Sequence, residues 1–302
     1  MKNFINYYYN LKIVDIYFID NIYIINDEKF RYVLKDYDNT QFLSYYNYLK
    51  NSLIKYEYFF EIIPNNADNY VSVINNKPYV LMKISNIKND LITIFDIKND
   101  MFIDYNNKLL GLTRFPWNVF WEKKVDYFEE IFYLKKDKYN NIYALFYYFV
   151  GLAENAIMYF KDSVQFEKKD INDELVISHN RISVNFRFYD YYDPTNIILD
   201  HPSRDISEFV KSLFINNCFD LTLFNDYLNS HYFSRYGLRM LYARIIFPSF
   251  FFDYIEKMLI DDSEIDLLYL ENRVEEFQTF SKNISLFFRD KYNIPIIPWL
   301  IK

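Results

Sequence analysis

The stretch from Asp190 to Phe214 constrains the fold of this chain more than any other. Its short β-branched run, Ile197 to Leu199, predicts a buried strand that ends at Asp200. Pro202 suits a first helical turn, and Asp205 brings negative charge to the positive end of the helix that follows. The apolar residues of that helix recur at the spacing of one face, at Ile206, Phe209, Val210, Leu213 and Phe214. An acidic loop, a strand and a helix in this order suggest a place that binds a cation or a phosphate.

Three residues of this stretch also have purely structural interpretations. Asp205 is typical of a carboxylate that caps a helix. Asp193 precedes Pro194, as in an ordinary turn. His201 fits a hydrogen-bonded structural histidine better than a ligand. The sequence of the stretch leaves these alternatives open.

Charge and cysteine content exclude several classes of protein. The formal charge is -7 and no block is strongly basic, which argues against a nucleic-acid surface. The aromatic fraction of 22% accompanies only 3 Gly and many Asn, Ile and Lys, a drift typical of AT-rich genomes, so it is weak evidence for base stacking. Cys218 is the only cysteine, which excludes an intramolecular disulfide and a zinc cluster of the usual spacing and indicates a reducing compartment.

Export and membrane insertion are not predicted. The N-terminal residues contain no apolar core of signal-peptide length and no small-residue cleavage site. No window approaches eighteen uninterrupted apolar residues, and the densest, Ile245 to Phe252, is short and contains Pro248. We therefore expect a soluble chain with no transmembrane segment.

The N-terminal part has the pattern of strands. Two runs, Ile22 to Ile25 and Phe30 to Lys35, flank a plausible hairpin turn. Lys35 at the end of the second run is typical of a solvated edge residue, so a functional role for it needs other support. A helix is predicted from Gln41 to Tyr56, and a second hairpin from Tyr70 to Met82. An antiparallel sheet with one inserted helix is the natural assembly.

Helices dominate the pattern after residue 84, with a strand-like alternation from Val176 to Phe188. Gly151 lies within one predicted helix, where glycine costs about 1 kcal/mol relative to alanine, so we expect close packing at that position. The predicted helices begin at Trp117, run through Leu145 to Phe160, and cover Tyr236 to Phe247, Phe250 to Met258 and Glu271 to Phe288. No internal repeat of solenoid length is present.

Four segments make the chain recognisable: Trp117 to Asp126, Gly151 to Tyr159, Leu199 to Phe209 and Leu241 to Pro248. With the order of elements, they resemble the CotS/YutH branch of bacterial kinase-like spore coat proteins, relatives of the aminoglycoside and choline phosphotransferases. The resemblance implies an α+β, protein-kinase-like fold of two lobes with a hinge at about Met82 to Ser85. Its N-lobe, 1–84, would be a small antiparallel sheet with one helix. Its C-lobe, 85–302, would be mainly helical and contain a strand loop at 176–200.

Several parts that kinase chemistry needs are absent from the expected positions. No glycine lies between Leu11 and Lys35, so no glycine-rich loop covers a triphosphate. Lys35 matches the lysine that contacts ATP phosphates, but the helix from Gln41 to Tyr56 has no acidic residue to pair with it. The best match to the phosphotransferase His-Gly-Asp segment is His179, Asn180 and Arg181, which puts a cation that cannot accept a proton in place of the catalytic carboxylate.

The remaining metal ligands are ambiguous. Either Asp193 or Asp200 matches the aspartate that would hold magnesium, and the loop does not align uniquely. Asn185 or Asn196 would be a second ligand, although an exposed turn asparagine is the simpler interpretation of both.

These departures favour a pseudokinase with a structural or interaction role and no cofactor. The resemblance implies other spore coat proteins as partners, and a location in the mother-cell cytoplasm or on the spore coat. The alternative is an active small-molecule phosphotransferase that uses ATP and magnesium. A third hypothesis is a groove between the lobes that binds a peptide or nucleotide as a regulatory ligand without turnover.

Overall fold

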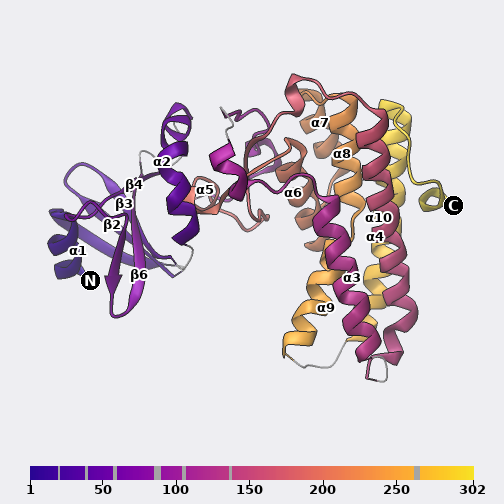
Figure 1. The fold of residues 1–302 in the computed structure, drawn as a ribbon, viewed down its shortest axis with the longest axis horizontal. Coiled ribbons are helices and arrows are strands. Elements are labelled where there is room, and N and C mark those ends of the chain that lie inside the picture. The colour runs from indigo at the N-terminus through magenta and orange to yellow at the C-terminus, as the bar shows by residue number, and fades with distance from the viewer. Residues whose placement is uncertain are drawn as a thin grey trace. The chain divides into compact units, whose positions relative to one another are not determined.

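The fold was obtained as a computed structural model, which describes residues 1–19, 21–37, 40–56, 60–84, 90–103, 107–135, 138–261 and 266–302 (Figure 1). The chain divides into two compact units. The first comprises Met1–Ile92, Met101–Thr113 and Asn185–Leu199, and the second comprises Thr93–Asp100, Arg114–Val184 and Asp200–Lys302. The strand loop predicted at 176–200 therefore contributes residues to both units. Ser85, at the end of the predicted hinge, lies outside the described residues.

The first unit is built on an antiparallel sheet. Its strands are β1 (Ile13–Ile19), β2 (Ile22–Asp27), β3 (Arg31–Asp36), β4 (Glu61–Ile63), β5 (Val71–Ile74) and β6 (Lys77–Ile84). They pair in the order β1-β2-β3-β6-β4, and β5 pairs with another part of β6. Both predicted hairpins are present, and Lys35 lies on the third strand as expected.

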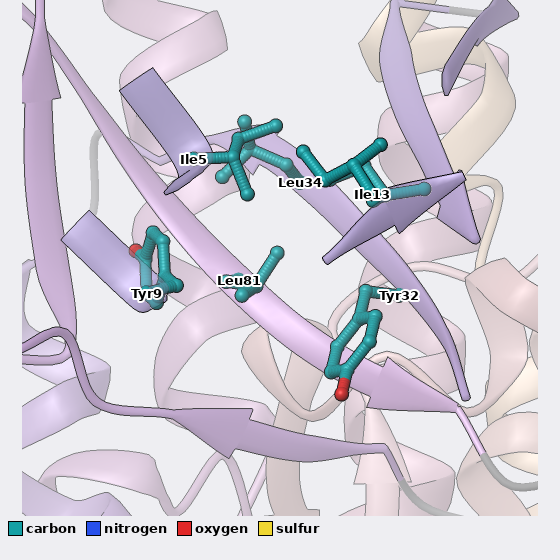
Figure 2. Close-up of a cluster of buried hydrophobic side chains, with 7 residues drawn as sticks. Ile5, Tyr9, Ile13, Tyr32, Leu34 and Leu81 are labelled. Carbon is teal, nitrogen blue, oxygen red and sulfur yellow. The ribbon is translucent and has the colours of Figure 1, made fainter. Parts of the chain in front are cut away.

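Apolar side chains on one face of this sheet form a core with an N-terminal helix, α1 (Lys2–Tyr9), which the sequence pattern did not predict. Figure 2 shows side chains from α1, β1, β3 and β6 gathered in this cluster. Its buried members are Ile5, Tyr9, Ile13, Ile25, Tyr32, Leu34 and Leu81. Burial of such side chains contributes roughly 1.5–3 kcal/mol each, so the cluster holds α1 on the sheet.

The inserted helix of the first unit is α2 (Thr40–Lys55), close to the predicted range. Its buried stripe consists of Phe42, Tyr46, Leu49 and Leu53. The hydroxyl of Tyr46 accepts a hydrogen bond of 2.9 Å from the backbone N–H of Ile62 in β4, which fixes the helix to the sheet. Shorter elements complete the unit: the 3-10 helices η2 (Asn107–Leu112) and η5 (Pro194–Asn196), the helical turn α5 (Phe188–Tyr191), and strand β8 (Ile197–Asp200), whose last residue belongs to the second unit.

The second unit is mainly helical. Its long helices are α3 (Asn118–Leu134), α4 (Tyr143–Phe166), α6 (Ser203–Ile215), α7 (Leu221–Ser230), α8 (Arg235–Ile246), α9 (Ser249–Asp261) and α10 (Leu267–Tyr292). It also contains strand β7 (Val176–His179) and the 3-10 helices η1 (Ile94–Asp96), η3 (Asn140–Ile142), η4 (Ile171–Asp173) and η6 (Pro298–Ile301). Figure 1 shows α4, α8 and α10 side by side, and α8 is buried along almost its whole length.

The high aromatic content of the chain serves packing in this helical unit. The rings of Phe132 and Phe146 stack with centroids 4.0 Å apart, and those of Phe149 and Phe251 with centroids 4.2 Å apart. Stacked pairs of this kind contribute about 0.5–1.5 kcal/mol beyond their buried area. None of the helices in the described ranges is long and apolar enough to cross a membrane.

Two expectations from sequence are wrong. The strand-like alternation from Val176 does not continue to Phe188: β7 ends at His179, and α5 begins at Phe188. The carbonyl groups of His179 and Asn180 instead accept hydrogen bonds from the side chain of Arg204. Close packing at Gly151 is also absent, since a Cβ atom added there would meet no neighbouring atom within 4 Å.

Candidate functional site

Lys35 is fixed by the sheet of the first unit. It lies near the end of β3, opposite Ile22 of β2 and Val80 of β6. Its side chain is 27% exposed and forms an ion pair with the carboxylate of Asp193. The acidic partner that α2 does not supply is therefore supplied by the segment between α5 and η5.

Asp193 is also the residue that caps η5. Its Oδ1 atom accepts hydrogen bonds from the backbone N–H of Thr195, at 2.8 Å, and from the hydroxyl of Thr195, at 2.7 Å. Its Oδ2 atom accepts from Lys35. Both carboxylate oxygens thus have donors, and the turn interpretation of Asp193 describes its local geometry.

Two further ionisable groups lie near this pair. Burial raises the pKa of Tyr37, and the negative charge of Asp193 raises it further. Burial also raises the pKa of Asp190, and the charge of Asp193 adds to the effect. Asp193 therefore lies beside a phenol and a second carboxyl group in a partly desolvated place, which makes the ammonium of Lys35 its natural partner.

His179 occupies the end of β7 in the second unit. Its backbone N–H donates to Asp205 Oδ1 at 3.0 Å, and its Nδ1 atom lies 2.6 Å from Asp205 Oδ2. Both side chains are almost completely buried. Asp205 lies in the first turn of α6 as predicted, but its side-chain bonds go to His179 rather than to the end of its own helix.

Arg204 connects the segment after β7 to the end of β8. It donates to the carbonyl of His179 at 3.0 Å through Nε and to the carbonyl of Asn180 at 2.8 Å through Nη2. Its Nη1 atom donates to Asp200 Oδ2 at 2.7 Å. Because one guanidinium offers five donors in a rigid plane, it can hold two backbone carbonyls and a carboxylate at once.

Asp200 is inaccessible to solvent, with 0% of its surface exposed. Its Oδ1 atom accepts from the indole Nε1 of Trp117 at 2.8 Å and from the backbone N–H of His201 at 2.7 Å. Its Oδ2 atom is paired with Arg204. A buried carboxylate with three donors is a structural ion, because burial without such partners would be very costly.

Arg181, at the expected position of the proton acceptor, points a largely exposed side chain at α9. Its Nη1 atom donates to Asp253 Oδ2 at 3.1 Å. The other oxygen of Asp253 accepts from Lys124 of α3 at 2.6 Å. A carboxylate is therefore present beside Arg181, but two cations contact it.

A second ionic cluster supports α6 from the side of α8 and α9. Glu208 lies 2.7 Å from the Nζ of Lys211 and 3.1 Å from Nη2 of Arg244. Burial lowers the pKa of Lys211 to about 8, although the charge of Glu208 acts in the opposite direction. Arg244 also lies over the ring of Trp117, 4.4 Å from its centroid, so this cluster contacts the indole that binds Asp200.

Both candidate magnesium ligands accept hydrogen bonds or ion pairs from the chain itself. Lys35 and Thr195 contact Asp193, and Trp117 and Arg204 are among the donors to Asp200. Within the described part of the chain, no group of three or more His, Cys, Asp or Glu side chains is placed to hold a metal ion. Their assignment to magnesium stays a prediction.

Several of these residues were predicted from the sequence as site residues, but their contact partners were not. Arg204 and Asp200 have the i, i+4 spacing of a helical ion pair, a signal that was available. No sequence spacing indicated the contact between Asp253 and Arg181, because Asp253 lies on α9, apart from all the predicted site residues. The two asparagines offered as second ligands are exposed at Asn185 and half-buried at Asn196, at the end of η5.

The fold is that of the kinase-like phosphotransferases. A crystal structure of an aminoglycoside phosphotransferase from Alicyclobacillus acidocaldarius subsp. acidocaldarius is similar, with a TM-score of 0.58, 12% sequence identity and coverage of 94% of this chain and 95% of that chain. The AMP-bound spectinomycin phosphotransferase APH(9)-Ia is similar with a TM-score of 0.50 and 14% identity, covering 93% of each chain. At these identities the likeness shows the fold alone, and it confirms the predicted α+β, kinase-like class.

Residues 2–290 match the family described as "Spore coat putative kinase YutH". The chain therefore belongs to this family, as the sequence motifs indicated. It is also 26% identical over 211 residues to the endospore coat-associated protein YutH of Bacillus subtilis (strain 168). That similarity covers 62% of this chain and 61% of the relative's length.

Proposed function

We propose that this protein is a catalytically degenerate member of its family, with a structural or interaction role and no phosphotransfer activity. The observation that carries the proposal is the ion pair between Lys35 and Asp193. The lysine that would contact nucleotide phosphates and one of the carboxylates that would hold magnesium neutralise each other. A ligand that uses either charge has to compete with the other residue of the pair.

The second unit supports the same conclusion from different residues. Phosphoryl transfer to a hydroxyl needs a positioned proton acceptor, which contributes about 10²- to 10⁴-fold to the rate. Arg181 cannot take this role, and Asp253 beside it contacts both Arg181 and Lys124. Asp200 is paired with Arg204 in the interior. Removal of a buried partner costs about 3–5 kcal/mol, so a metal would not readily displace Arg204.

The proposed setting is the spore coat, with other coat proteins as partners and the mother-cell cytoplasm as the place of synthesis. The name of the Bacillus subtilis relative, which describes an endospore coat-associated protein, supports this setting. Fusion of the chain to a fluorescent protein in a spore-forming host tests it. We expect fluorescence on the developing spore, and fluorescence spread through the cell after sporulation would contradict the proposal.

Catalytic degeneracy is tested with purified full-length chain, ATP and magnesium. We expect no phosphate release above buffer and no change in melting temperature at millimolar nucleotide, because Lys35 and Asp193 stay paired. A ligand present at 100 times its Kd would stabilise the folded chain by about 2.7 kcal/mol, so binding would be evident. ATP turnover that disappears in Lys35→Ala and Asp193→Ala, but persists in Lys29→Ala, would overturn the proposal.

The alternative is an active phosphotransferase for a small hydroxyl or amine substrate. The observation that favours it is the same pair, since a lysine and a carboxylate within contact of each other are two groups that a nucleotide site requires close together. This alternative needs Asp193 to release Lys35 when nucleotide arrives. It predicts an ATP-dependent rise in melting temperature that Lys35→Ala abolishes.

A further inference from the structure

The second unit carries an open groove between α10 and the end of α6. The groove has a volume of about 580 Å³ and lies within one compact unit. It is lined by Phe214, Asn217, Phe219, Leu221, Glu275, Glu276, Thr279, Phe280 and Asn283. Asp205 and Phe214 are nine residues apart on α6, so the groove lies about 14 Å along the helix from Asp205.

Three phenylalanine rings form the floor of the groove. Phe214 and Phe280 stack with centroids 4.6 Å apart, and Phe219 meets Phe280 edge-on at 5.0 Å. The ending of α6 creates this arrangement: the N–H of Cys218 donates to the carbonyl of Leu213 at 2.8 Å, with Asn217 at a φ of 56°. This helix-ending turn reverses the direction of the chain and places the ring of Phe219 beside that of Phe280, which completes the floor.

One cation of the chain already uses part of this surface. The guanidinium of Arg273 lies 5.5 Å from the centroid of the Tyr269 ring, which does not line the groove, and 5.9 Å from that of the Phe214 ring, which does. It donates to Glu276 at 2.7 Å, to Asn217 Oδ1 at 3.2 Å and to the carbonyl of Ile215 at 3.0 Å. The combination of an aromatic ring, a carboxylate and an amide oxygen thus holds a cation at one end of the groove.

Glu275 lies in the same turn of α10 as Glu276, and it lines the groove together with Phe219, Phe280 and Asn283. Glu275 is exposed, and among the described residues no cation is paired with it. We propose that this groove is a docking surface for a basic segment of a partner protein, in which a lysine or arginine side chain lies on the rings and pairs with Glu275. The net charge of -7 favours such a partner.

The shape of the groove selects a segment of chain over a small cation. Five of its nine lining residues are exposed, whereas sites for small molecules bury most of the surface of their ligand. An open groove with carboxylates on one edge suits an extended segment that contributes several contacts. The proposal does not depend on nucleotide binding, because it uses none of the residues near Lys35 or Asp200.

Fluorescence anisotropy tests the proposal with the full chain, without nucleotide, and a labelled octapeptide of alternating Lys and Ala. We expect saturable binding and none for the matching peptide of Glu and Ala. Glu275→Gln should weaken binding about threefold, the effect of one exposed ion pair. Thr279→Arg should weaken it at least about tenfold, a loss of roughly 1.4 kcal/mol, because the new side chain fills the groove.

Matched controls change the same charges elsewhere in the second unit. Glu130→Gln on α3 and Gln165→Arg on α4 alter exposed positions outside the groove, and we expect both to bind like the parent chain. Melting temperatures of all variants establish that they are folded. Equal weakening in the controls, binding of the acidic peptide, or displacement by lysine amide as efficient as by the peptide would each overturn the proposal.

Discussion

Asp193 and Asp200 follow each other closely in the sequence, and either one matched the expected metal aspartate, yet the structure holds them differently. Asp193 is paired with a partly exposed lysine and caps a short turn. Asp200 is fully buried and held by an indole, a backbone amide and a guanidinium. A flexible partner permits exchange, whereas rigid buried partners do not. Of the two carboxylates, only Asp193 is held in a way that a ligand could change.

The largest expected effect comes from removal of the buried carboxylate. Asp200→Ala should destabilise the second unit by about 3–5 kcal/mol, because it leaves the charge of Arg204 unpaired in the interior. All three tryptophans, Trp117, Trp121 and Trp299, belong to this unit, so urea unfolding followed by tryptophan fluorescence reports on it.

The double variant Asp200→Leu/Arg204→Met provides the control for this change. Because both charges leave together, we expect it to recover much of the lost stability. A destabilisation below about 1 kcal/mol in Asp200→Ala would contradict the structural role, since that is the size of an exposed pair.

Acid should unfold the second unit through its buried carboxylates. Burial acts to raise the pKa of Glu208, but the charges of Lys211 and Arg244 outweigh it and hold the pKa below its usual range. Burial also acts to raise the pKa of Asp173. The hydrogen bonds that Asp173 accepts from His201 and its other donors outweigh this effect and lower the pKa. Both groups bind protons more readily in the unfolded chain, so they stabilise the fold at neutral pH.

The contribution of these carboxylates is lost as the pH falls below their unfolded values, about 4.3 for Glu and 3.9 for Asp. Unfolding free energies at pH 7 and at pH 3–5, measured by tryptophan fluorescence, check the prediction. Glu208→Gln should make the free energy of unfolding depend less steeply on pH in this range. Asp190→Asn should not, because Asp190 belongs to the first unit, which the tryptophan signal does not report on, and burial raises its pKa, so its contribution has the opposite sign. An unchanged slope in Glu208→Gln would contradict the assignment.

The pair in the first unit should respond more weakly. Lys35→Met is expected to cost about 1 kcal/mol or less, because its exposure allows solvent to screen the ion pair. Asp193→Ala should cost somewhat more, by about 0.5–2 kcal/mol for the loss of the cap on Thr195. Hydrogen exchange of β3 and of the η5 segment measures both, with Lys29→Met as the control. A loss as large as that in Asp200→Ala would remove the contrast between the two carboxylates.

The smallest effect is a gain in stability at Gly151. Gly151→Ala should stabilise the second unit by about 0.4–1 kcal/mol, since α4 leaves room for a methyl group there and alanine favours the helix. Gly237→Ala in α8 is the matched contrast, because its added Cβ would lie 3.0 Å from Asp173 Oδ1. Tryptophan-detected urea unfolding of both variants checks the difference. Equal effects would show that helix propensity alone decides them.

Local patterns in the sequence were sufficient for much of the fold. The hairpins, the strand that bears Lys35, the buried run at β8 and the stripe of α6 all follow from the periodicity of neighbouring residues. The end of β7 did not follow from local pattern, because the carbonyl of its last residue, His179, accepts its hydrogen bond from the side chain of Arg204, which lies on α6. The packing at Gly151 was wrong for a different reason: Phe149, Ala153 and Phe160 lie on one buried face of α4, and helical spacing places Gly151 away from that face.

The candidate site depended on contacts between distant segments. Sequence identified Lys35 and Asp193 separately, but their pairing requires that residues 185–199 join the N-terminal unit. Arg181 was expected to replace a proton acceptor, and its contact with Asp253 required the position of α9. Charges attract whichever partner the fold brings near, so their partners are set by tertiary structure rather than by spacing.

The ion pair between Asp200 and Arg204 also bears on which residues such chains retain during evolution. A single substitution at either position leaves the charge of the other residue buried and unpaired. Selection for folding alone is therefore enough to keep both residues in a chain that has lost enzymatic activity. An aspartate at the end of this strand is therefore weak evidence that a chain still catalyses phosphoryl transfer.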